Sequence, residues 1–300
     1  MIDARTETSE RPAWLEEETR FYQVVKFATF GVITLVVVFP FLSVLATSLA
    51  SEADVVSGGG LVLWPQHPTL EAYRTIFAGG VITRAIVISL AVTTVGTLAS
   101  LAVTIAMAYG LSRRIWGGRI ILFLALGTLL FTPGIIPNYL AVKQLGLLNS
   151  YAALVLPVLV NAFNLIVLRQ FFMAIPGELL DSARMDGAND WDLLVRIVLP
   201  VSKAVVAVVA LFYAVFYWNE FFRPLLYLND SSMWPLSLVL RLYVVQGAPL
   251  PTAGEVLENA PPLESIQMAV VMVAVIPILL VYPFLQRYFT RGVLSGAIKG

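Results

Sequence analysis

Long stretches of hydrophobic residues alternate with short polar segments along this chain of 300 residues. A helix needs about 20 apolar residues to cross a bilayer core of about 30 Å, because each residue adds about 1.5 Å. Every backbone N–H and C=O group must also be paired inside the bilayer, which favours helices. The stretches that meet this requirement are residues 27–48, 85–111, 119–141, 151–173, 202–223 and 266–286. The pattern predicts an all-α integral membrane protein with six transmembrane helices.

Prolines fall inside or at the ends of these stretches. In a bundle, neighbouring helices and hydroxyl side chains can satisfy the carbonyl groups that a proline leaves unpaired. We therefore expect kinks rather than breaks at these positions. The prolines concerned are Pro40, Pro133, Pro137, Pro157, Pro277 and Pro283.

Composition and charge agree with membrane insertion and give it a direction. The chain is 59% hydrophobic and 13% charged, whereas soluble proteins have about 25% charged residues. Its net charge is zero, so no basic field points to nucleic acid. Of the 19 lysines and arginines, 14 lie in one of the two alternating sets of connecting segments. Because cytoplasmic segments retain positive charge, both termini are expected in the cytoplasm.

This orientation divides the chain into segments. Residues 1–26 form a cytoplasmic N-terminal segment without the pattern of a cleaved signal peptide, so the first helix is expected to serve as its own insertion signal. Residues 27–286 form the six-helix membrane domain, and residues 287–300 form a cytoplasmic tail. Within the domain, outside loops at 49–84 and 224–265 each contain a candidate surface helix, at 69–77 and 234–245.

Several kinds of chemistry are excluded or disfavoured by what the sequence contains. There is no cysteine, which excludes a disulfide, a thiolate nucleophile and a Cys/His zinc site. The single histidine, His67, lies in an outside loop and is assigned a surface or packing role. None of the lysines is followed by serine or threonine, so the chain has no phosphate-binding P-loop. We predict neither an enzyme nor a metal site, and ion-coupled secondary transport is disfavoured because spans two, three and six lack central ionisable groups.

A polar segment at residues 174–200 lies between the fourth and fifth predicted spans. Pro176 suits the first turn of a helix that runs over about 175–185. Gly187 can adopt the left-handed conformation that ends a helix. Asn189 can cap a second helix, which extends to Pro200 with Trp191, Leu194, Val195 and Val198 on one face. Two short helices around a glycine form either a rigid protrusion that fits a groove on a soluble partner or an ordinary interfacial helical loop.

The same segment resembles the EAA motif of binding-protein-dependent ABC importer permeases. That motif reads roughly E-A-A-x-x-D-G-A, then eight residues and I-x-L-P. The matching residues here are Asp181, Ser182, Ala183, Asp186, Gly187, Ala188, Ile197, Leu199 and Pro200. Asp181 and Ser182 depart conservatively from the pattern. The stretches "GLLNSYAALVLP", "WNEFFRPLLYL" and "QRYFTRGVLSGAIKG" look like the carbohydrate-importer branch, which includes the maltose permeases. "SSMWPLSLVLR" looks closest to the subgroup for oligosaccharides such as aldouronates.

The resemblance implies a fold and a set of partners. The fold is that of type I ABC importer permeases, in a bacterial or archaeal cytoplasmic membrane. The partners are a second homologous permease that completes a heterodimer, two copies of an ABC ATPase, an extracytoplasmic sugar-binding protein and membrane lipid, with no nucleic acid. This chain binds no cofactor, and ATP and Mg belong to the ATPase subunits. A permease for another solute, such as a polyol, glycerol phosphate or an amino acid, remains the alternative.

The resemblance also assigns roles to residues. Contact with the ATPase is expected at Asp181, Ser182, Ala183, Asp186, Gly187, Ala188, Trp191 and Pro200, and in the tail at Gly292, Gly296 and Lys299. Asp181 and Asp186 could instead cap their own helices. Candidates for the solute path, which needs neutral polar groups and aromatic faces, are Asn161, Asn164, Tyr213, Tyr217, Trp218, Asn219 and Glu220. For these residues an interfacial aromatic belt and hydrogen bonds between helices are the alternatives, and Glu220 could pair with Arg223.

Overall fold

The computed structural model describes residues 19–60, 62–78, 80–113, 115–131, 133–247 and 262–297, and side chains in the last helix only to residue 281 and at Pro283. The described residues contain helices and no strand. Among these described residues, three helices are long and apolar enough to cross a membrane, namely α1 (Arg20–Ser48), α4 (Val81–Ser112) and the first part of α15 (Leu263–Ala297). They correspond to the first, second and sixth predicted spans. Helix α1 begins before its predicted start, and α15 continues through the predicted boundary at 286.

The remaining elements are shorter. The α-helices are α2 (Glu52–Ser57), α3 (Glu71–Ala78), α5 (Gly118–Leu130), α6 (Ile135–Gln144), α7 (Ala152–Val155), α8 (Ala162–Met173), α9 (Gly177–Met185), α10 (Asp190–Asp192), α11 (Leu199–Val201), α12 (Lys203–Asn219), α13 (Phe222–Tyr227) and α14 (Leu236–Leu240). Two 3₁₀ turns, η1 (Leu156–Val158) and η3 (Ser231–Met233), and two π-helical stretches, η2 (Leu193–Val198) and η4 (Arg241–Val245), complete them.

The predicted third span is broken, which corrects the expectation of a kink. Helix α5 ends at Leu130 and α6 begins at Ile135. Between them Phe131 is extended, Pro133 cannot donate a backbone hydrogen bond, and Gly134 has a φ of 84°. A residue before proline avoids the helical region, so the Thr-Pro-Gly sequence ends the helix instead of bending it. Pro40, Pro277 and Pro283 lie inside unbroken helices, as expected.

The fourth predicted span is a bent helix pair, whereas the fifth corresponds to α12, which is bent away from the helix that precedes it. The α7–η1 and α8 segments meet at 52°, and the helix from α10 to α11 meets α12 at 85°. Counting each pair as one span gives up to five candidate spans in the described part of the chain. Asn161 lies at the first bend, where its side-chain oxygen accepts a hydrogen bond from the Asn164 N–H at 3.2 Å and so caps α8.

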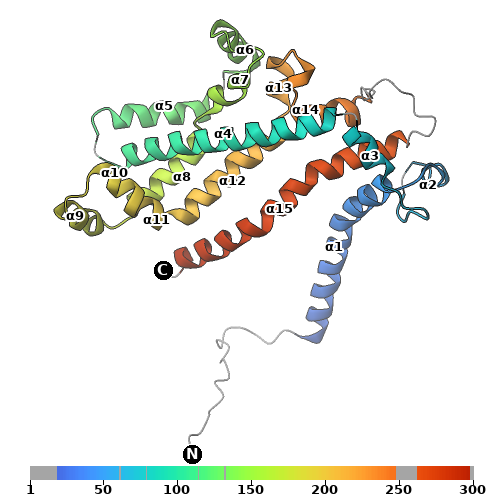
Figure 1. The fold of residues 1–300 in the computed structure, drawn as a ribbon. Helices are drawn as coiled ribbons and strands as arrows, with labels where there is room; N and C mark the ends of the chain where they lie inside the picture. The colour runs from blue at the N-terminus through green and yellow to red at the C-terminus, as the bar shows by residue number, and fades with distance from the viewer. Residues whose placement is uncertain are drawn as a thin grey trace, which may run out of the picture.

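Helix α4 lies at the centre of the body and contacts α8, α12 and α14 (Figure 1). Leu165, Leu168, Leu193 and Val209 are fully buried in the main apolar cluster. Helix α1 extends away from this body and contacts α15 (Figure 1). Its buried residues lie only near its C-terminal end. Most of the apolar surface of α1 is therefore exposed within this chain.

A chain of hydrogen bonds ties α4 to α12 and to the bend before α8. The Asn161 N–H donates to the Tyr213 hydroxyl at 2.9 Å, and Tyr213 lies 2.8 Å from the Thr104 hydroxyl. Thr104 donates its only hydroxyl proton to the Ser100 carbonyl at 2.6 Å, so Tyr213 must be the donor to Thr104. Tyr217 makes a second contact, 2.8 Å from the Ser100 hydroxyl. Hydrogen bonds between these polar groups thus fix how the helices are oriented relative to one another, which apolar packing alone would not do.

The outside loops are partly as predicted. Helix α3 forms at the predicted position, and the His67 side chain is 80% exposed, in agreement with a surface role. Its backbone N–H donates to Asp54 at 3.0 Å and holds the pKa of that carboxyl below its usual value, although burial opposes the shift. The helix predicted on the surface at 234–245 is instead buried, because Leu236 and Val239 pack in a cluster with residues of α4 and α15. Residues 1–18, residues 248–261 of the second outside loop and Lys299 lie outside the described residues.

Candidate functional site

The polar segment at 174–200 forms the predicted pair of short helices. Helix α9 starts directly after Pro176, two residues later than predicted, and ends at Met185. At its end the Gly187 N–H donates to the Arg184 carbonyl and the Ala188 N–H donates to the Ala183 carbonyl, both at 3.0 Å. These two bonds are those of a Schellman motif. Ala183 and Ala188 both pack against the main apolar cluster, which gives the motif its usual apolar contact.

Gly187 adopts the predicted left-handed conformation, with a φ of 87°. No heavy atom lies within 4 Å of the place where a Cβ would be. Glycine is therefore required by the backbone conformation and not by a lack of space. The turn directs the chain from α9 into α10 without any side chain at the elbow.

The second helix is capped as predicted but has a different geometry. The Asn189 side chain accepts a hydrogen bond from the Asp192 N–H at 2.9 Å. After α10 the chain forms the π-helical stretch η2 and then α11. The π geometry changes which residues share a face: Leu193, Leu194 and Val198 are buried, whereas Trp191 and Val195 are exposed. The predicted face of Trp191, Leu194, Val195 and Val198 is thus only half correct.

The two helices present one anchored side and one open side. Leu180, Leu193 and Val198 anchor the pair in the main cluster. Met185 is 89% exposed and Trp191 is 71% exposed, and Asp186 is also exposed. The Asp181 carboxylate pairs with Arg184 at 3.0 Å, so its described contact is an ion pair within α9 and not a cap. We call residues 174–200 the coupling loop.

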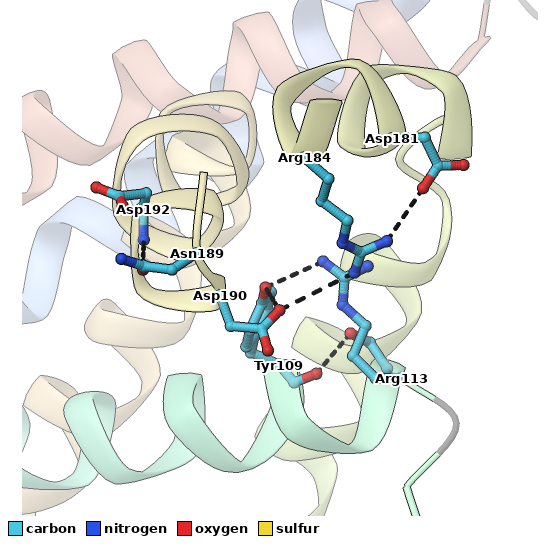
Figure 2. Close-up of polar contacts among 8 residues, drawn as sticks. Tyr109, Arg113, Asp181, Arg184, Asn189, Asp190 and Asp192 are labelled. Carbon is cyan, nitrogen blue, oxygen red and sulfur yellow. Dashed lines mark hydrogen bonds and ion pairs between the residues drawn. The ribbon is translucent and has the colours of Figure 1, made fainter. Parts of the chain in front are cut away.

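Tyr109 near the end of α4 contacts the coupling loop and is itself held by Arg113, and the sequence analysis did not single out either residue. The Tyr109 hydroxyl donates to Asp190 Oδ1 at 3.4 Å, and Arg113 Nη2 donates to the Tyr109 oxygen at 3.1 Å. The Arg113 guanidinium also lies over the Tyr109 ring, 4.8 Å from its centroid. Figure 2 shows Asp190 between Tyr109 and Arg184, whose Nη2 is 3.9 Å from the same oxygen. The available signal was an aromatic residue followed by a basic pair at the end of an apolar span.

The residues predicted to line the solute path make different kinds of contact and do not form a single group. Tyr213, Tyr217 and Asn164 are buried, and the two tyrosine hydroxyls bond to α4. Trp218 Nε1 donates to the Ala274 carbonyl at 3.2 Å, and the Asn219 amide donates to Val215. Trp218 and Asn219 both line a cavity of about 270 Å³ between α12, α14 and α15.

Glu220 makes a contact that the sequence suggested. Its carboxylate pairs with Arg223 Nη1 at 2.7 Å and also accepts hydrogen bonds from the Phe222 and Arg223 N–H groups. Gly292 and Gly296, predicted in a tail, lie inside α15. In the described part of the chain, no group of three or more His, Cys, Asp or Glu residues could hold a metal ion.

These features define a class before any comparison is made. Long apolar helices pack around a shared core, and a pair of short helices joined at Gly187 lies exposed between two of them, which is the architecture of a membrane-spanning protein. The chain belongs to the family described as binding-protein-dependent transport system inner membrane component, whose sequence profile matches residues 100–295. It is therefore a transport permease subunit and not a catalytic one.

Similar proteins extend over nearly the whole chain. The polygalacturonan/rhamnogalacturonan transport system permease protein YtcP of Bacillus subtilis is 43% identical over 288 residues, which cover 94% of this chain and all of that protein. Protein LplC of the same organism is 42% identical over 283 residues, covering 94% and 96% of the two chains. A chain in the crystal structure of a bacterial ABC transporter that imports the acidic polysaccharide alginate is 29% identical, with a TM-score of 0.86, and covers 93% of this chain and all of that one.

Proposed function

We propose that this chain is the membrane-spanning permease subunit of an ATP-driven ABC importer for an oligosaccharide. In this proposal a second homologous permease completes the pore, two ABC ATPase subunits lie beneath it, and an extracytoplasmic binding protein delivers the sugar. The transporter lies in the cytoplasmic membrane of a bacterium or archaeon, with both termini of this chain in the cytoplasm. The observation that carries the proposal is the coupling loop, which is internally rigid, anchored in the core and open on one side.

The geometry of the coupling loop supports a mechanical role. The Schellman bonds at Gly187 fix the end of α9, and the Asn189 cap fixes the start of α10. The apolar anchors join both helices to the core formed with α4, α8 and α12. When the ATPase subunits bind ATP and close, they displace the loop. Because the loop is rigid, the displacement reaches the adjacent spans, and the pore changes from inward-open to outward-open.

The open side of the loop has the composition of a docking surface. Met185 and Trp191 offer exposed apolar area beside Asp181 and Asp186. Large apolar side chains with a polar rim are characteristic of protein interfaces. We assign this surface to a groove of the ATPase, with Ser182, Ala183, Gly187, Ala188 and Pro200 giving the loop its shape. The C-terminal residues Gly292, Gly296 and Lys299 are assigned to a second contact with the ATPase subunits.

The solute path is assigned to neutral polar and aromatic groups. Trp218 and Asn219 line a cavity whose mixed apolar and polar walls suit a pyranose ring. Asn164, Tyr213 and Tyr217 are buried, and the two tyrosine hydroxyls bond to α4 in this conformation. Asn161 is exposed, its backbone N–H donates to Tyr213, and its side chain caps α8. They contribute to the path only if those bonds open during transport. Glu220, which is paired with Arg223, is placed at the edge of the path.

The carbohydrate assignment is supported by the substrates named for similar transporters. YtcP is named for polygalacturonan and rhamnogalacturonan, and the structural neighbour imports alginate. All three substrates are polysaccharides. An importer for a polyol, glycerol phosphate or an amino acid is the alternative, because other members of an importer family can share the fold without sharing the solute.

An uptake experiment with the complete transporter tests this function. A strain lacking this chain receives it on a plasmid, and accumulation of labelled solutes is measured with a galacturonate trimer, a neutral arabinose trimer, glycerol phosphate and an amino acid mixture. Restored uptake of at least one oligosaccharide, abolished by an ATPase-dead partner, is expected. Restoration of only glycerol phosphate or amino acid uptake would overturn the carbohydrate assignment.

A further inference from the structure

We infer that Tyr109 and Asp190 form the joint through which movement of the coupling loop reaches α4, and that Arg113 and Arg184 position this joint. The inference rests on the proposed function of the coupling loop and adds a connection to it. The motif that defines the loop includes none of these residues. Tyr109 lies in the second span and Arg113 directly after it, and both are distant in sequence from the loop.

The contacts form a polarised chain that crosses three elements. Arg113 at the end of α4 donates to the Tyr109 oxygen, and the Tyr109 hydroxyl donates to Asp190 on α10. Arg184 on α9 approaches the same Asp190 oxygen and also pairs with Asp181. A hydroxyl that accepts from a cation and donates to a carboxylate is polarised in one direction, which strengthens both bonds. Asp190 is therefore the residue at which α4, α9 and α10 meet (Figure 2).

The distances show which contacts in this series of hydrogen bonds and ion pairs are the longest. Contacts inside one element are short, at 3.1 Å from Arg113 to Tyr109 and 3.0 Å from Arg184 to Asp181. Contacts between elements are longer, at 3.4 Å from Tyr109 to Asp190 and 3.9 Å from Arg184 to Asp190. Both longer distances end on Asp190. A movement of α10 relative to α4 therefore changes the Asp190 contacts first, while the contacts within each helix persist.

Arg113 has capacity for a further bond. Its Nε is buried and has no hydrogen-bond partner. A buried unsatisfied donor raises the free energy of the arrangement that contains it. The Arg113 side chain can therefore accept a change in the position of α10 without losing a hydrogen bond at Nε.

The end of α4 is also fixed on its other side. Arg169 Nε on α8 donates to the Leu111 carbonyl at 2.9 Å. This bond caps the C-terminus of α4 with a cation, as the helix dipole favours. The Tyr109–Asp190 joint therefore acts on a helix end that is already held by α8, and a displacement there moves α4 and α8 together.

The ion pair between Arg184 and Asp190 contributes little to folding stability. The side chains of Arg184 and Asp190 are 45% and 77% exposed, and exposed ion pairs contribute about 0–1 kcal/mol. Changing them should therefore leave folding intact and alter how movement is transmitted. This makes the inference testable with conservative variants.

The experiment uses the whole transporter, with its partner permease, ATPase and loaded binding protein, reconstituted in lipid vesicles. ATP hydrolysis and oligosaccharide uptake are measured together for Tyr109→Phe and Asp190→Asn. Tyr109→Phe removes only the hydroxyl and keeps the ring beneath Arg113. The matched control is Asp192→Asn, which makes the same change of charge on the same helix. The Asp192 carboxylate forms an ion pair with Arg196 of that helix, at 3.3 Å, and lies outside the joint.

We expect both joint variants to assemble and hydrolyse ATP, but to transport about fivefold less oligosaccharide per ATP hydrolysed, a typical coupling effect. Asp192→Asn should keep the ratio of the unchanged protein. If Tyr109→Phe and Asp190→Asn also keep that ratio, the inference is wrong while the proposed function stands. If the unchanged protein shows no oligosaccharide uptake, the proposed function itself fails.

A reversible lock gives a second test. The chain contains no cysteine, so Arg113→Cys with Asp190→Cys introduces the only thiols in this subunit. A short bifunctional thiol cross-linker between them should stop the transport that this double variant retains, and a cleavable version should return it on reduction to the level of the variant without cross-linker. Equal transport by the cross-linked and the uncross-linked variant would overturn the inference.

Discussion

At the scale of single residues, two glycines have different physical reasons for being glycine. Gly187 has a positive φ and open space around its missing Cβ. Gly96 has a helical backbone, but a Cβ there would lie 2.9 Å from the Tyr217 ring. The first position depends on backbone conformation and the second on close approach of two helices. Substitutions at the two positions should therefore fail in different ways.

Substitution of Gly187 should affect coupling and not insertion. Gly187→Val places a β-branched residue at a φ of 87°, which costs roughly 1–2 kcal/mol. Asparagine tolerates this conformation better, so Gly187→Asn should be milder. We expect normal amounts of protein in the membrane and reduced uptake per ATP hydrolysed. Gly177→Ala in the same loop, which has ordinary φ and open space, is the control, and equal transport by Gly187→Val and this control would contradict the assignment.

Substitution of Gly96 should affect stability. Gly96→Ala forces the Tyr217 ring away from α4, and overpacking of this kind costs about 1–3 kcal/mol. Gly110→Ala on the same helix meets no neighbour within 4 Å and should be neutral or slightly stabilising. The thermal unfolding temperature of the purified protein in detergent is the measurement. A Gly96→Ala protein as stable as Gly110→Ala would show that the helices separate easily here.

At the scale of elements, hydroxyl groups fix how α4, α8 and α12 pack. Tyr213 takes part in two of these bonds, one with the Asn161 N–H and one with Thr104. Tyr217 takes part in one, with Ser100. The sequence indicated polar groups here and left open whether they face a solute or a neighbouring helix. In this conformation their partners are neighbouring helices.

Tyr213→Phe should therefore destabilise the protein more than Tyr217→Phe. The first change removes two hydrogen bonds, the one from the Asn161 N–H and the one to Thr104, and each hydrogen bond contributes about 0.5–1.5 kcal/mol. The second removes one hydroxyl pair, at about 0.6 kcal/mol for an average bond between membrane helices. Denaturation of the two variants in the same detergent measures the difference. Equal stabilities would mean that water or another group replaces the tyrosine hydroxyl at Asn161.

The limits of prediction from sequence are also clearest at this scale. The apolar stretches, the cap at Asn189 and the turn at Gly187 were predictable because each depends on a few adjacent residues. The break at Phe131–Gly134 was missed because proline is compatible with both a kink and a break, and the following glycine decides between them. The burial of Leu236 and Val239 was missed because it depends on α4 and α15, which lie far away in sequence. Tyr109 was missed for the same reason, since its partner Asp190 is 81 positions away.

At the scale of the whole molecule, orientation follows from the distribution of charge and can be measured directly. The absence of cysteine allows single-cysteine variants without further changes. Trp116→Cys and Met185→Cys occupy exposed positions on the predicted cytoplasmic side, and Ser231→Cys occupies an exposed position on the other. In intact cells, a membrane-impermeant maleimide should label only Ser231→Cys. Labelling of the other two before permeabilisation would reverse the orientation.

The π-helical stretch at Leu193–Val198 has a consequence for the length of the coupling loop. A π turn closes one residue later than an α turn, so this stretch contains one residue more than an α-helix with the same number of turns. With α-helical spacing (the α register), Trp191 and Val195 would share a face with Leu194 and Val198. With the observed π-helical spacing (the π register), Leu193 is buried together with Leu194 and Val198 instead. The segment therefore carries apolar residues for both registers. A change between them would advance the helix by about 1.5 Å and rotate it by about 100°, so the reach of the loop relative to α12 can change in one discrete step.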